Sequence, residues 1–330
     1  MASILILGGT AWLGRTIATL GVAAGHEVTC AARGQSGEAP PGARFVAIDR
    51  TVPGTLDALA REQWDHVVEL AWDPVVVQAG LEALAERAAH WTLVSSISVY
   101  DGDAGVGADE TQALLEPDPA GDYGAQKAHA EAMSAAAVRD RLLIVRPGLI
   151  VGAGDPSDRF SYWPSRFALA ADIGGAVLMP PVSDMNGDAW AQVIEADDLA
   201  AFILQAAMDA RSGPVDATGL PVPLAEVLDT AATAAGFDGA RHSPGAAWLL
   251  EHDVQYWAGP RSLPLWLPPE MPGFARRDTG RFEAWKGTTR PLTETIARVL
   301  ADERARGVDR ERHAGLTRAE ERALLAKLRG

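Results

Sequence analysis

The stretch GDYGAQKAHAE, residues 121–131, places Tyr123 four residues before Lys127. The chain has only four tyrosines and three lysines, so random placement would give about 0.04 such pairs at this helix-neighbour spacing. A phenol has a reference pKa near 10, and a positive charge one helical turn away brings that pKa towards neutral pH. The spacing therefore predicts a general acid–base pair on one helix face, in preference to two solvated polar residues.

A second stretch that could do chemistry is GGTAWLGR, which follows the apolar run SILIL and precedes a helical pattern. Glycines at a strand-to-helix turn let the backbone approach a pyrophosphate, which the amides of the helix N-terminus then hold. Gly8, Gly9 and Gly14 can serve these purposes. The turn therefore predicts a dinucleotide site, with an ordinary strand–helix turn as the alternative.

The residues after the second and third apolar runs bear on the choice of cofactor. The run 27–32 ends without the acidic residue that binds the ribose hydroxyls of NAD, and Arg33 follows it. An arginine there suits a 2′-phosphate and predicts NADP(H), with a solvated arginine as the alternative. Arg15 and Arg50 could assist, while Asp49 could reach the adenine or cap a turn.

The elements that must position these residues alternate in the first half of the chain. Apolar runs predict strands at 3–7, 27–32, 44–48, 66–71, 91–95 and 142–146, and helical patterns lie at 12–24, 55–62, 75–89 and 123–139. This alternation predicts an α/β fold with a Rossmann-type, doubly wound parallel sheet. Residues 189–208 predict one more strand and helix returning to the sheet, and Thr317 with Glu320 predicts a capping box on a C-terminal helix.

The second half is richer in Pro, Gly and Trp and predicts a smaller, loop-rich substrate lobe. We expect residues 1–150 and 189–212 to form the dinucleotide-binding domain and residues 151–188 and 213–330 to form that lobe. Residues 244–274 contain Trp248, Trp257, Trp266 and Phe274 together with six prolines and one arginine, which predicts an apolar wall suited to an uncharged or aromatic carbonyl compound. The alternative is a diphosphate site on which four arginines converge: Arg159, Arg166, Arg276 and Arg277.

Composition excludes several classes of protein. A net charge of −15 disfavours nucleic acid, whose binding rests on a basic surface. No run of about 18 apolar residues predicts a membrane span, and the strand pattern begins at residue 3, which leaves no room for a signal peptide. We therefore expect a cytoplasmic protein without a membrane partner. Cys30 stands alone in an apolar run, and neither it nor the seven histidines show metal-ligand spacing.

Taken in order, these motifs resemble the extended branch of the short-chain dehydrogenase/reductase superfamily, whose members are NAD-dependent epimerases, dehydratases and related reductases. The likeness covers roughly residues 3–210 and rests on LGGTAWLG, VVELAW, LVSSISVYDG, YGAQK, VRPGLIVGAGDP and VIEADDLA. It implies that Ser96 joins Tyr123 and Lys127 as a catalytic residue. The cofactor site that it implies, together with the residues considered above, comprises Gly8, Thr10, Ala11, Trp12, Leu13, Gly14, Arg33, Asp49, Arg50, Leu70, Ala71, Tyr123, Lys127, Pro147 and Gly148.

The chain departs from the family pattern in two ways. Ala11 replaces the middle glycine of the turn and adds a methyl group where the backbone approaches the cofactor. Ile97 and Ser98 occupy the places where the family's dehydratases carry an acidic pair, so a dehydratase is not expected.

The function expected from the residues and the resemblance is an NADP(H)-dependent oxidoreductase. Hydride would pass between the nicotinamide and a ketone or secondary alcohol of a small or medium organic molecule. Tyr123 would protonate the oxygen, Ser96 would donate a hydrogen bond to it, and Lys127 would also hold the ribose hydroxyls. The alternatives are an NAD(P)-dependent sugar epimerase and a non-catalytic NADP-binding sensor or scaffold. The small-molecule substrate is the expected partner, and the family commonly forms homodimers.

Overall fold

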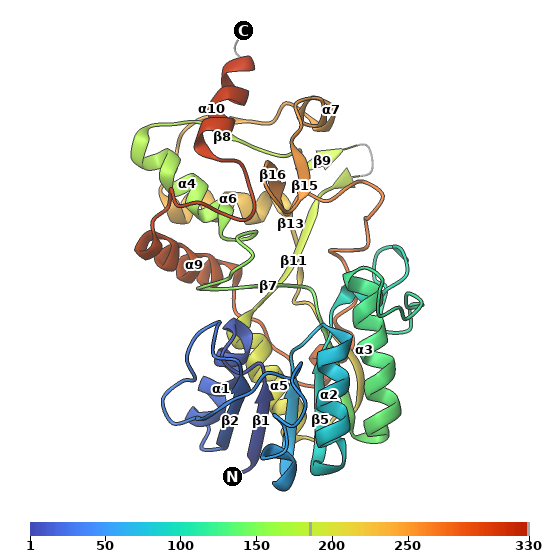
Figure 1. Ribbon diagram of the computed structural model, residues 1–330. Helices are drawn as coiled ribbons and strands as arrows, with labels where there is room; N and C mark the ends of the chain where they lie inside the picture. The colour runs from blue at the N-terminus through green and yellow to red at the C-terminus, as the bar shows by residue number, and fades with distance from the viewer. Residues whose placement is uncertain (185–186, 329–330) are drawn as a thin grey trace. The chain divides into compact units, whose positions relative to one another are not determined.

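The computed structural model describes residues 1–184 and 187–328, which divide into two compact units (Figure 1). Unit 1 comprises Met1–Leu149, Ala196–Gly219 and Arg277–Thr288. Unit 2 comprises Ile150–Glu195, Leu220–Arg276 and Thr289–Gly330.

Unit 1 is built on a seven-stranded parallel sheet with the order β12-β6-β5-β4-β1-β2-β3, the doubly wound arrangement that the alternating pattern predicted. Its strands are β1 (Ser3–Leu7), β2 (Glu27–Ala32), β3 (Arg44–Ala47), β4 (Trp64–Glu69), β5 (Ala88–Val94), β6 (Leu142–Pro147) and β12 (Gly213–Ala217). Its helices are α1 (Trp12–Ala23), α2 (Pro74–Leu84), α3 (Tyr123–Val138), α5 (Ala196–Met208) and α8 (Gly280–Ala284), with 3-10 turns η1 (Leu59–Arg61), η2 (Ala85–Arg87), η3 (Ile97–Val99) and η4 (Arg139–Arg141).

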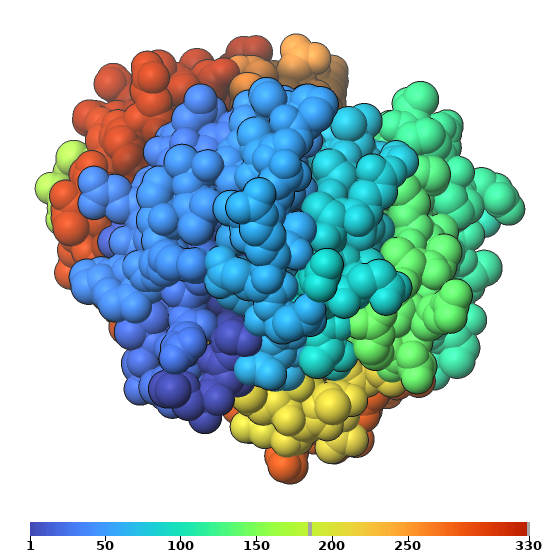
Figure 2. All heavy atoms as spheres, turned by 60° about the horizontal axis from the view of Figure 1, so that its bottom comes forward, coloured from blue at the N-terminus to red at the C-terminus, as the bar shows by residue number. Residues whose placement is uncertain are grey.

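Both faces of this sheet are covered, because its strands are apolar on both sides. Helix α1 packs against α5, and α2 packs against α3 (Figure 1). Successive residues of β1 supply the two cores: Leu5 and Leu7 belong to the buried cluster that includes Trp91, whereas Ile4 lies beside Gly21 of α1. Figure 2 shows the yellow α5 segment beside the dark blue start of the chain, as expected from the packing of α1 on α5.

The strand order reverses between β1 and β4, since β2 and β3 lie on one side of β1 and β4, β5 and β6 lie on the other. In open parallel sheets, ligands bind at the carboxyl ends of the strands beside such a switch point. The segments that leave β1, β2, β3 and β4 therefore meet where a ligand site is expected.

Several sequence expectations for unit 1 need correction. The seventh strand is β12, which pairs with β6, whereas β11 (Trp190–Glu195) does not return to this sheet and pairs with short strands of unit 2. Residues 213–219 and 277–288, expected in the second lobe, therefore lie in unit 1, and 189–195 lie in unit 2. The helix expected at 55–62 is a set of turns ending in η1, in which the Thr55 hydroxyl donates to the carbonyls of Asp49 and Val52.

Unit 2 contains more helix than its loop-rich composition suggested. Its helices are α4 (Tyr162–Ile173), α6 (Leu224–Ala235), α7 (Ala246–Glu251), α9 (Leu292–Arg306) and α10 (Arg318–Lys327). Its strands are β7 (Leu149–Val151), β8 (Val177–Leu178), β9 (Ser183–Asp184), β10 (Gly187–Asp188), β11, β13 (Pro221–Pro223), β14 (Arg241–His242), β15 (Gln255–Trp257) and β16 (Ser262–Pro264). The first nine residues of α4 are buried, so α4 lacks the polar face by which a sequence pattern reveals a helix. The predicted capping box of α10, formed by Thr317 and Glu320, is present.

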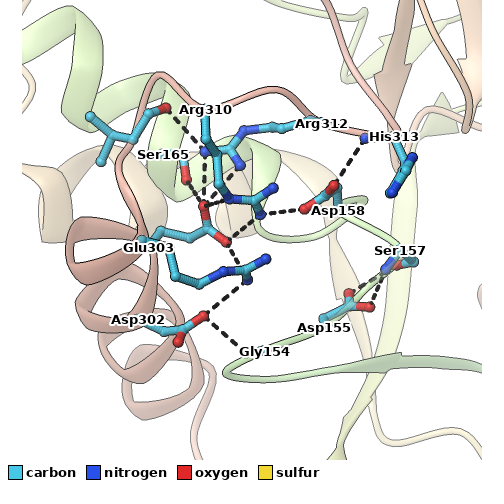
Figure 3. A network of polar contacts seen from close by, with 12 residues as sticks. Gly154, Asp155, Ser157, Asp158, Ser165, Asp302, Glu303, Arg310, Arg312 and His313 are labelled. Carbon is cyan, nitrogen blue, oxygen red and sulfur yellow. Dashed lines mark hydrogen bonds and ion pairs between the residues drawn. The ribbon is translucent and has the colours of Figure 1, made fainter. Parts of the chain in front are cut away.

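Glu303 of α9 is the centre of a polar network in unit 2 (Figure 3). Its carboxylate is fully buried and accepts hydrogen bonds from Ser165 Oγ at 3.1 Å, Arg306 Nη1 at 3.1 Å, Arg310 Nη2 at 2.8 Å and Arg312 Nη1 at 2.8 Å. Burying a carboxylate is costly unless it is paired, and here three guanidinium groups surround it. Glu303 therefore holds the segment after α9 against α4.

Replacing Glu303 with Gln should lower the free energy of unfolding of unit 2 by about 3–5 kcal/mol, because the surrounding arginines would lose their buried counter-charge. The matched control is Asp302→Asn on the same helix, whose carboxylate is partly exposed and bonds to the Gly154 amide at 2.9 Å. We expect that variant to cost about 1 kcal/mol or less. Urea unfolding followed by circular dichroism measures both, and equal losses would contradict the central role of Glu303.

Candidate active site

The turn after β1 places three glycines where side chains do not fit. Gly8 has a φ of 96°, in the left-handed region that favours glycine. A Cβ on Gly9 would lie 2.8 Å from Cys30 Cβ on β2, and one on Gly14 would lie 2.3 Å from the Gly8 carbonyl oxygen. The glycines therefore let α1 begin directly against the turn, as a pyrophosphate-binding turn requires. Cys30 is fully buried, and its burial raises the pKa of its thiol to about 11.

Helix α1 begins without a side-chain cap. Ala11 is the N-cap residue, with a φ of −75° and no side-chain hydrogen bond to the first amides of the helix. Its conformation is ordinary for an L-residue and its side chain is exposed, so this position does not require glycine. Amides that no side chain caps at a helix N-terminus form a site for an anion.

A cleft of about 430 Å³ lies at the carboxyl ends of the strands beside the switch point. The structure brings eight of the expected cofactor residues together in its lining: Gly8, Thr10, Ala11, Arg33, Asp49, Arg50, Leu70 and Ala71. The expected residues that do not line it are Trp12, Leu13, Gly14, Tyr123, Lys127, Pro147 and Gly148. Glycines that a Cβ would obstruct, an uncapped helix start and a cleft of this size fit a dinucleotide.

Arg33 and Asp49 follow β2 and β3 and line the part of the cleft next to these two strands. Arg33 is exposed and directly follows β2. Asp49 Oδ1 accepts hydrogen bonds from the Thr51 hydroxyl at 2.7 Å and the Thr51 amide at 3.0 Å. These bonds, and then the charge of Arg33, hold the pKa of Asp49 below its usual value. Asp49 thus caps the turn after β3, and Arg33 places a positive charge beside it.

Helix α3 presents the tyrosine and lysine that the sequence singled out. It begins at Tyr123, and the Asp122 carboxylate caps it by accepting from the Ala125 amide at 3.0 Å. Tyr123 is 47% exposed and its ring centroid lies 6.3 Å from that of Trp72, which lines the cleft. The phenol therefore stands at the start of a capped helix, next to the cleft.

Lys127 lies one turn further along α3 and is 3% exposed. Its ammonium donates to the Val94 carbonyl at 2.7 Å and to the Ala71 carbonyl at 3.0 Å, at the ends of β5 and β4. Burial lowers the pKa of Lys127 to about 8, although the carboxylates of Glu69 and Glu131 act in the opposite direction. An ammonium has three donors, so the two carbonyls leave one for a further acceptor.

The segment that carries Ser96 lies against the start of α3. Ser96 caps η3, and its hydroxyl accepts from the Ser98 amide and donates to the Ser98 hydroxyl, both at 3.1 Å. A Cβ on Gly124 would lie 2.3 Å from the Ser98 carbonyl oxygen. Gly124 therefore allows the tyrosine helix to approach the serine segment closely. Ser95, directly before Ser96, is buried, and its amide donates to the Val145 carbonyl at 2.7 Å.

Glu131 fixes the next turn of α3. Its carboxylate accepts from Arg146 Nε at 3.0 Å and Arg146 Nη2 at 2.6 Å, and both side chains are buried. Arg146, on β6, also donates to the Tyr100 hydroxyl at 2.9 Å. Helix α3 is thus tied to three strands, through Lys127 at the ends of β4 and β5 and through Glu131 at β6.

Sequence reasoning missed three residues of this site. Trp72 directly follows the apolar run of β4, in the stretch VVELAW, and contacts Tyr123. Glu69 is a fully buried acid at the end of that strand and pairs with Arg50, so the guanidinium of this cleft-lining residue is already engaged. Glu69 could have been noticed in the sequence, because it is a glutamate in an otherwise apolar run. The close contact that Gly124 makes could not, because nothing in the sequence around Gly124 indicates it.

Most of the chain matches the model of one protein family. Residues 4–217 match the model of the "NAD dependent epimerase/dehydratase family". The chain belongs to this family. It is therefore an enzyme of the extended short-chain dehydrogenase/reductase type, as its motifs implied.

One relative is the dTDP-6-deoxy-L-talose 4-dehydrogenase (NAD(P)(+)) of Kitasatospora kifunensis, 36% identical over 178 residues, which cover 47% of this chain and 54% of the relative. The match thus spans about half the length of that relative. Among solved structures, the UDP-Glc/GlcNAc 4-epimerase of Campylobacter jejuni has a TM-score of 0.70 at 16% identity, covering 92% of this chain and 100% of the other. The UDP-glucose 4-epimerase of Thermus thermophilus in complex with NAD has a TM-score of 0.64 at 19% identity, covering 92% and 99%. These structures share the fold.

Neither a membrane span nor a metal cluster is found in the described part of the chain. Across residues 1–184 and 187–328, the helices are too short or too polar to cross a membrane. Within the same ranges, the structure has no group of three or more His, Cys, Asp or Glu side chains that could hold a metal ion.

Replacing Gly14 with Ala should weaken nicotinamide dinucleotide binding by about tenfold or more, because the added Cβ would displace the turn from its contact with α1. The reverse exchange at a nearby position, Ala11→Gly, should keep or tighten the affinity, since it removes a methyl group without a change of conformation. Titration calorimetry with NADPH and NADH measures both variants. Unchanged binding in Gly14→Ala, or a large loss in Ala11→Gly, would contradict this assignment of the turn.

Proposed function

We propose that the protein is an NADP(H)-dependent oxidoreductase that interconverts a carbonyl compound and its alcohol, with Tyr123, Lys127 and Ser96 as catalytic residues. The observation that carries this proposal is the capped start of α3, where Tyr123 stands beside the cleft and the buried Lys127 ammonium lies one turn below it. A non-catalytic sensor would not need a buried ammonium next to an exposed phenol.

The chemistry assigns a separate task to each side chain. In the reducing direction, hydride for the carbonyl carbon would come from a dihydronicotinamide bound in the cleft. Tyr123 gives its phenolic proton to the carbonyl oxygen, and the positive charge of Lys127 stabilises the phenolate that remains. Ser96 donates a hydrogen bond to the same oxygen and so favours the developing alkoxide. The third N–H of Lys127 would hold the ribose hydroxyls.

The preference for NADP(H) rests on Arg33. An exposed guanidinium after the second strand, in the lining of the cleft, can pair with a 2′-phosphate, whereas an acidic residue at this place would select NAD. Arg50 contributes less than its sequence position suggested, because Glu69 already engages its guanidinium.

The substrate class rests on unit 2. A cleft of about 100 Å³ in unit 2 is lined by Trp190, Tyr256, Trp266 and several prolines, with Arg276 also in its lining. The four arginines that could have formed a diphosphate site have separate partners there or in unit 1. Arg159 lies over the ring of Trp257, Arg166 pairs with Glu321, Arg276 lies over Trp190 and Arg277 pairs with Asp216. These contacts favour an uncharged or aromatic carbonyl compound over a sugar nucleotide.

The experiment that tests the function is a turnover assay with NADPH and a panel of apolar ketones, aromatic aldehydes and dTDP- or UDP-sugars. We expect oxidation of NADPH with one of the apolar compounds. Turnover of a sugar nucleotide alone would instead support the sugar dehydrogenase or epimerase activity that the names of the relatives suggest.

Replacing Tyr123 with Phe should reduce turnover by about 10²-fold or more while NADPH still binds, because the change removes only the proton donor. The matched control is Tyr162→Phe, at the start of α4 in unit 2, because Tyr162 lines neither of the two clefts. Steady-state rates and NADPH titrations separate the two effects. Near-normal turnover in Tyr123→Phe would contradict the catalytic assignment and favour the sensor.

Replacing Arg33 with Ser should lower the affinity for NADPH by about tenfold or more and leave the affinity for NADH nearly unchanged, since a charge-assisted bond to the 2′-phosphate is lost. Arg61→Ser is the control, because Arg61 belongs to unit 1 but does not line the cleft. Fluorescence titrations with both nucleotides give the ratio of dissociation constants. An equal loss for NADPH and NADH would argue against a 2′-phosphate site.

A further inference from the structure

Glu69 is a fully buried acid at the last position of β4, in a strand that is otherwise largely apolar. Its Oε1 accepts from Arg50 Nη2 at 3.0 Å, and its Oε2 pairs with Arg50 Nη1. Arg50, which follows β3 and is itself largely buried, also donates to the Val76 carbonyl at 3.3 Å. The pair thus joins the ends of β3 and β4 to the start of α2.

The same carboxylate fixes the backbone on which Lys127 rests. Glu69 Oε1 accepts from the Ala71 amide at 2.7 Å, and the carbonyl of Ala71 accepts from Lys127 Nζ at 3.0 Å. Both polar groups of Ala71 are therefore engaged, one by Glu69 and one by Lys127. A shift of the Glu69 carboxylate would move the acceptor of the ammonium.

Of the carboxylates near Lys127, Glu69 has the larger effect on the charge of the ammonium. Burial lowers the pKa of Lys127, and two acids oppose this, Glu69 more strongly than Glu131. Glu131 accepts two hydrogen bonds from Arg146, and Glu69 accepts two from Arg50. Each acid therefore acts on Lys127 as part of an ion pair, and the balance of each pair sets the potential at the ammonium.

We propose that Glu69 and Arg50 form a positioning pair for Lys127, in which Glu69 holds the Ala71 carbonyl under the ammonium and keeps that ammonium charged, while Arg50 limits the effect. The inference rests on the proposed function only in giving Lys127 its catalytic task beside Tyr123. Neither Glu69 nor Arg50 touches the reacting atoms, so both act through Lys127.

The direct test is a ¹³C NMR titration of protein labelled at the lysine Cε, which is simple because the chain has three lysines. Lys127→Arg assigns the signal of Lys127, and Lys286, whose side chain is 68% exposed, is an internal reference. The wild-type signal should titrate near the Lys127 pKa of about 8. In Glu69→Gln the midpoint should fall by about one pH unit, because the attractive charge is lost and Arg50 is left unpaired.

Arg50→Gln should move the midpoint upward, since Glu69 then acts on Lys127 without its partner. Opposite signs distinguish this pair from mere structural support: a loosened site would admit water and raise the pKa of Lys127 in both variants. The control is Glu62→Gln, which breaks the exposed Arg44–Glu62 pair of unit 1 and should leave the midpoint unchanged. A rise or no change in Glu69→Gln would overturn the proposal. If Glu69→Gln does not fold, a fall or no change of the midpoint in Arg50→Gln would overturn it.

The pH dependence of turnover is the second readout. Lys127 is charged below its folded-state pKa, so the wild-type rate should fall as the pH rises through about 8. In Glu69→Gln this fall should begin at a lower pH, by the same interval as in the NMR titration. If the NMR midpoint shifts in Glu69→Gln but the protein shows no turnover, the positioning pair is supported and the proposed function is refuted. Turnover with an unmoved NMR midpoint would refute the pair alone.

Discussion

The candidate site depends on the burial of one lysine ammonium. Lys127 is nearly inaccessible to water, and the carbonyls of Val94 and Ala71 take the place of two hydration waters. A buried charge is tolerated only when it is hydrogen-bonded and electrostatically balanced. The ends of β4 and β5, together with Glu69 and Glu131, provide both, so the position of α3 and of Tyr123 at its start follows from where this charge can be held.

Close backbone contacts make that arrangement possible. Gly14 lets α1 meet the turn after β1, and Gly124 lets α3 meet the segment that carries Ser96, each at a distance that a Cβ would obstruct. Both contacts lie where a helix starts beside the carboxyl ends of the strands. The site has two halves, the glycine turn after β1 and helix α3, on opposite sides of the switch point. In both halves a glycine allows a helix to start in close contact with a neighbouring backbone segment.

Much of unit 1 could be predicted from the sequence, because its strands and helices are set by local apolar patterns. Residues 3–7 and 27–32 form strands at the predicted bounds, and the Tyr123–Lys127 spacing falls on one helix. Features that depend on distant partners could not be predicted. The short strand β12 is recognised only by its pairing with β6, and the buried α4 has little polar face. Arg50 had the sequence position of a phosphate ligand, but Glu69, nineteen residues away, engages it.

We propose that this site moves a hydride while Tyr123 moves the proton. Incubation of the protein with NADPH carrying deuterium at nicotinamide C4, followed by mass spectrometry of the alcohols formed from the carbonyl panel, tests it most directly. We expect one deuterium on the former carbonyl carbon of a product from one of the two C4 epimers of the cofactor, and none from the other. NADPH that binds tightly but leaves every carbonyl compound unlabelled would contradict it.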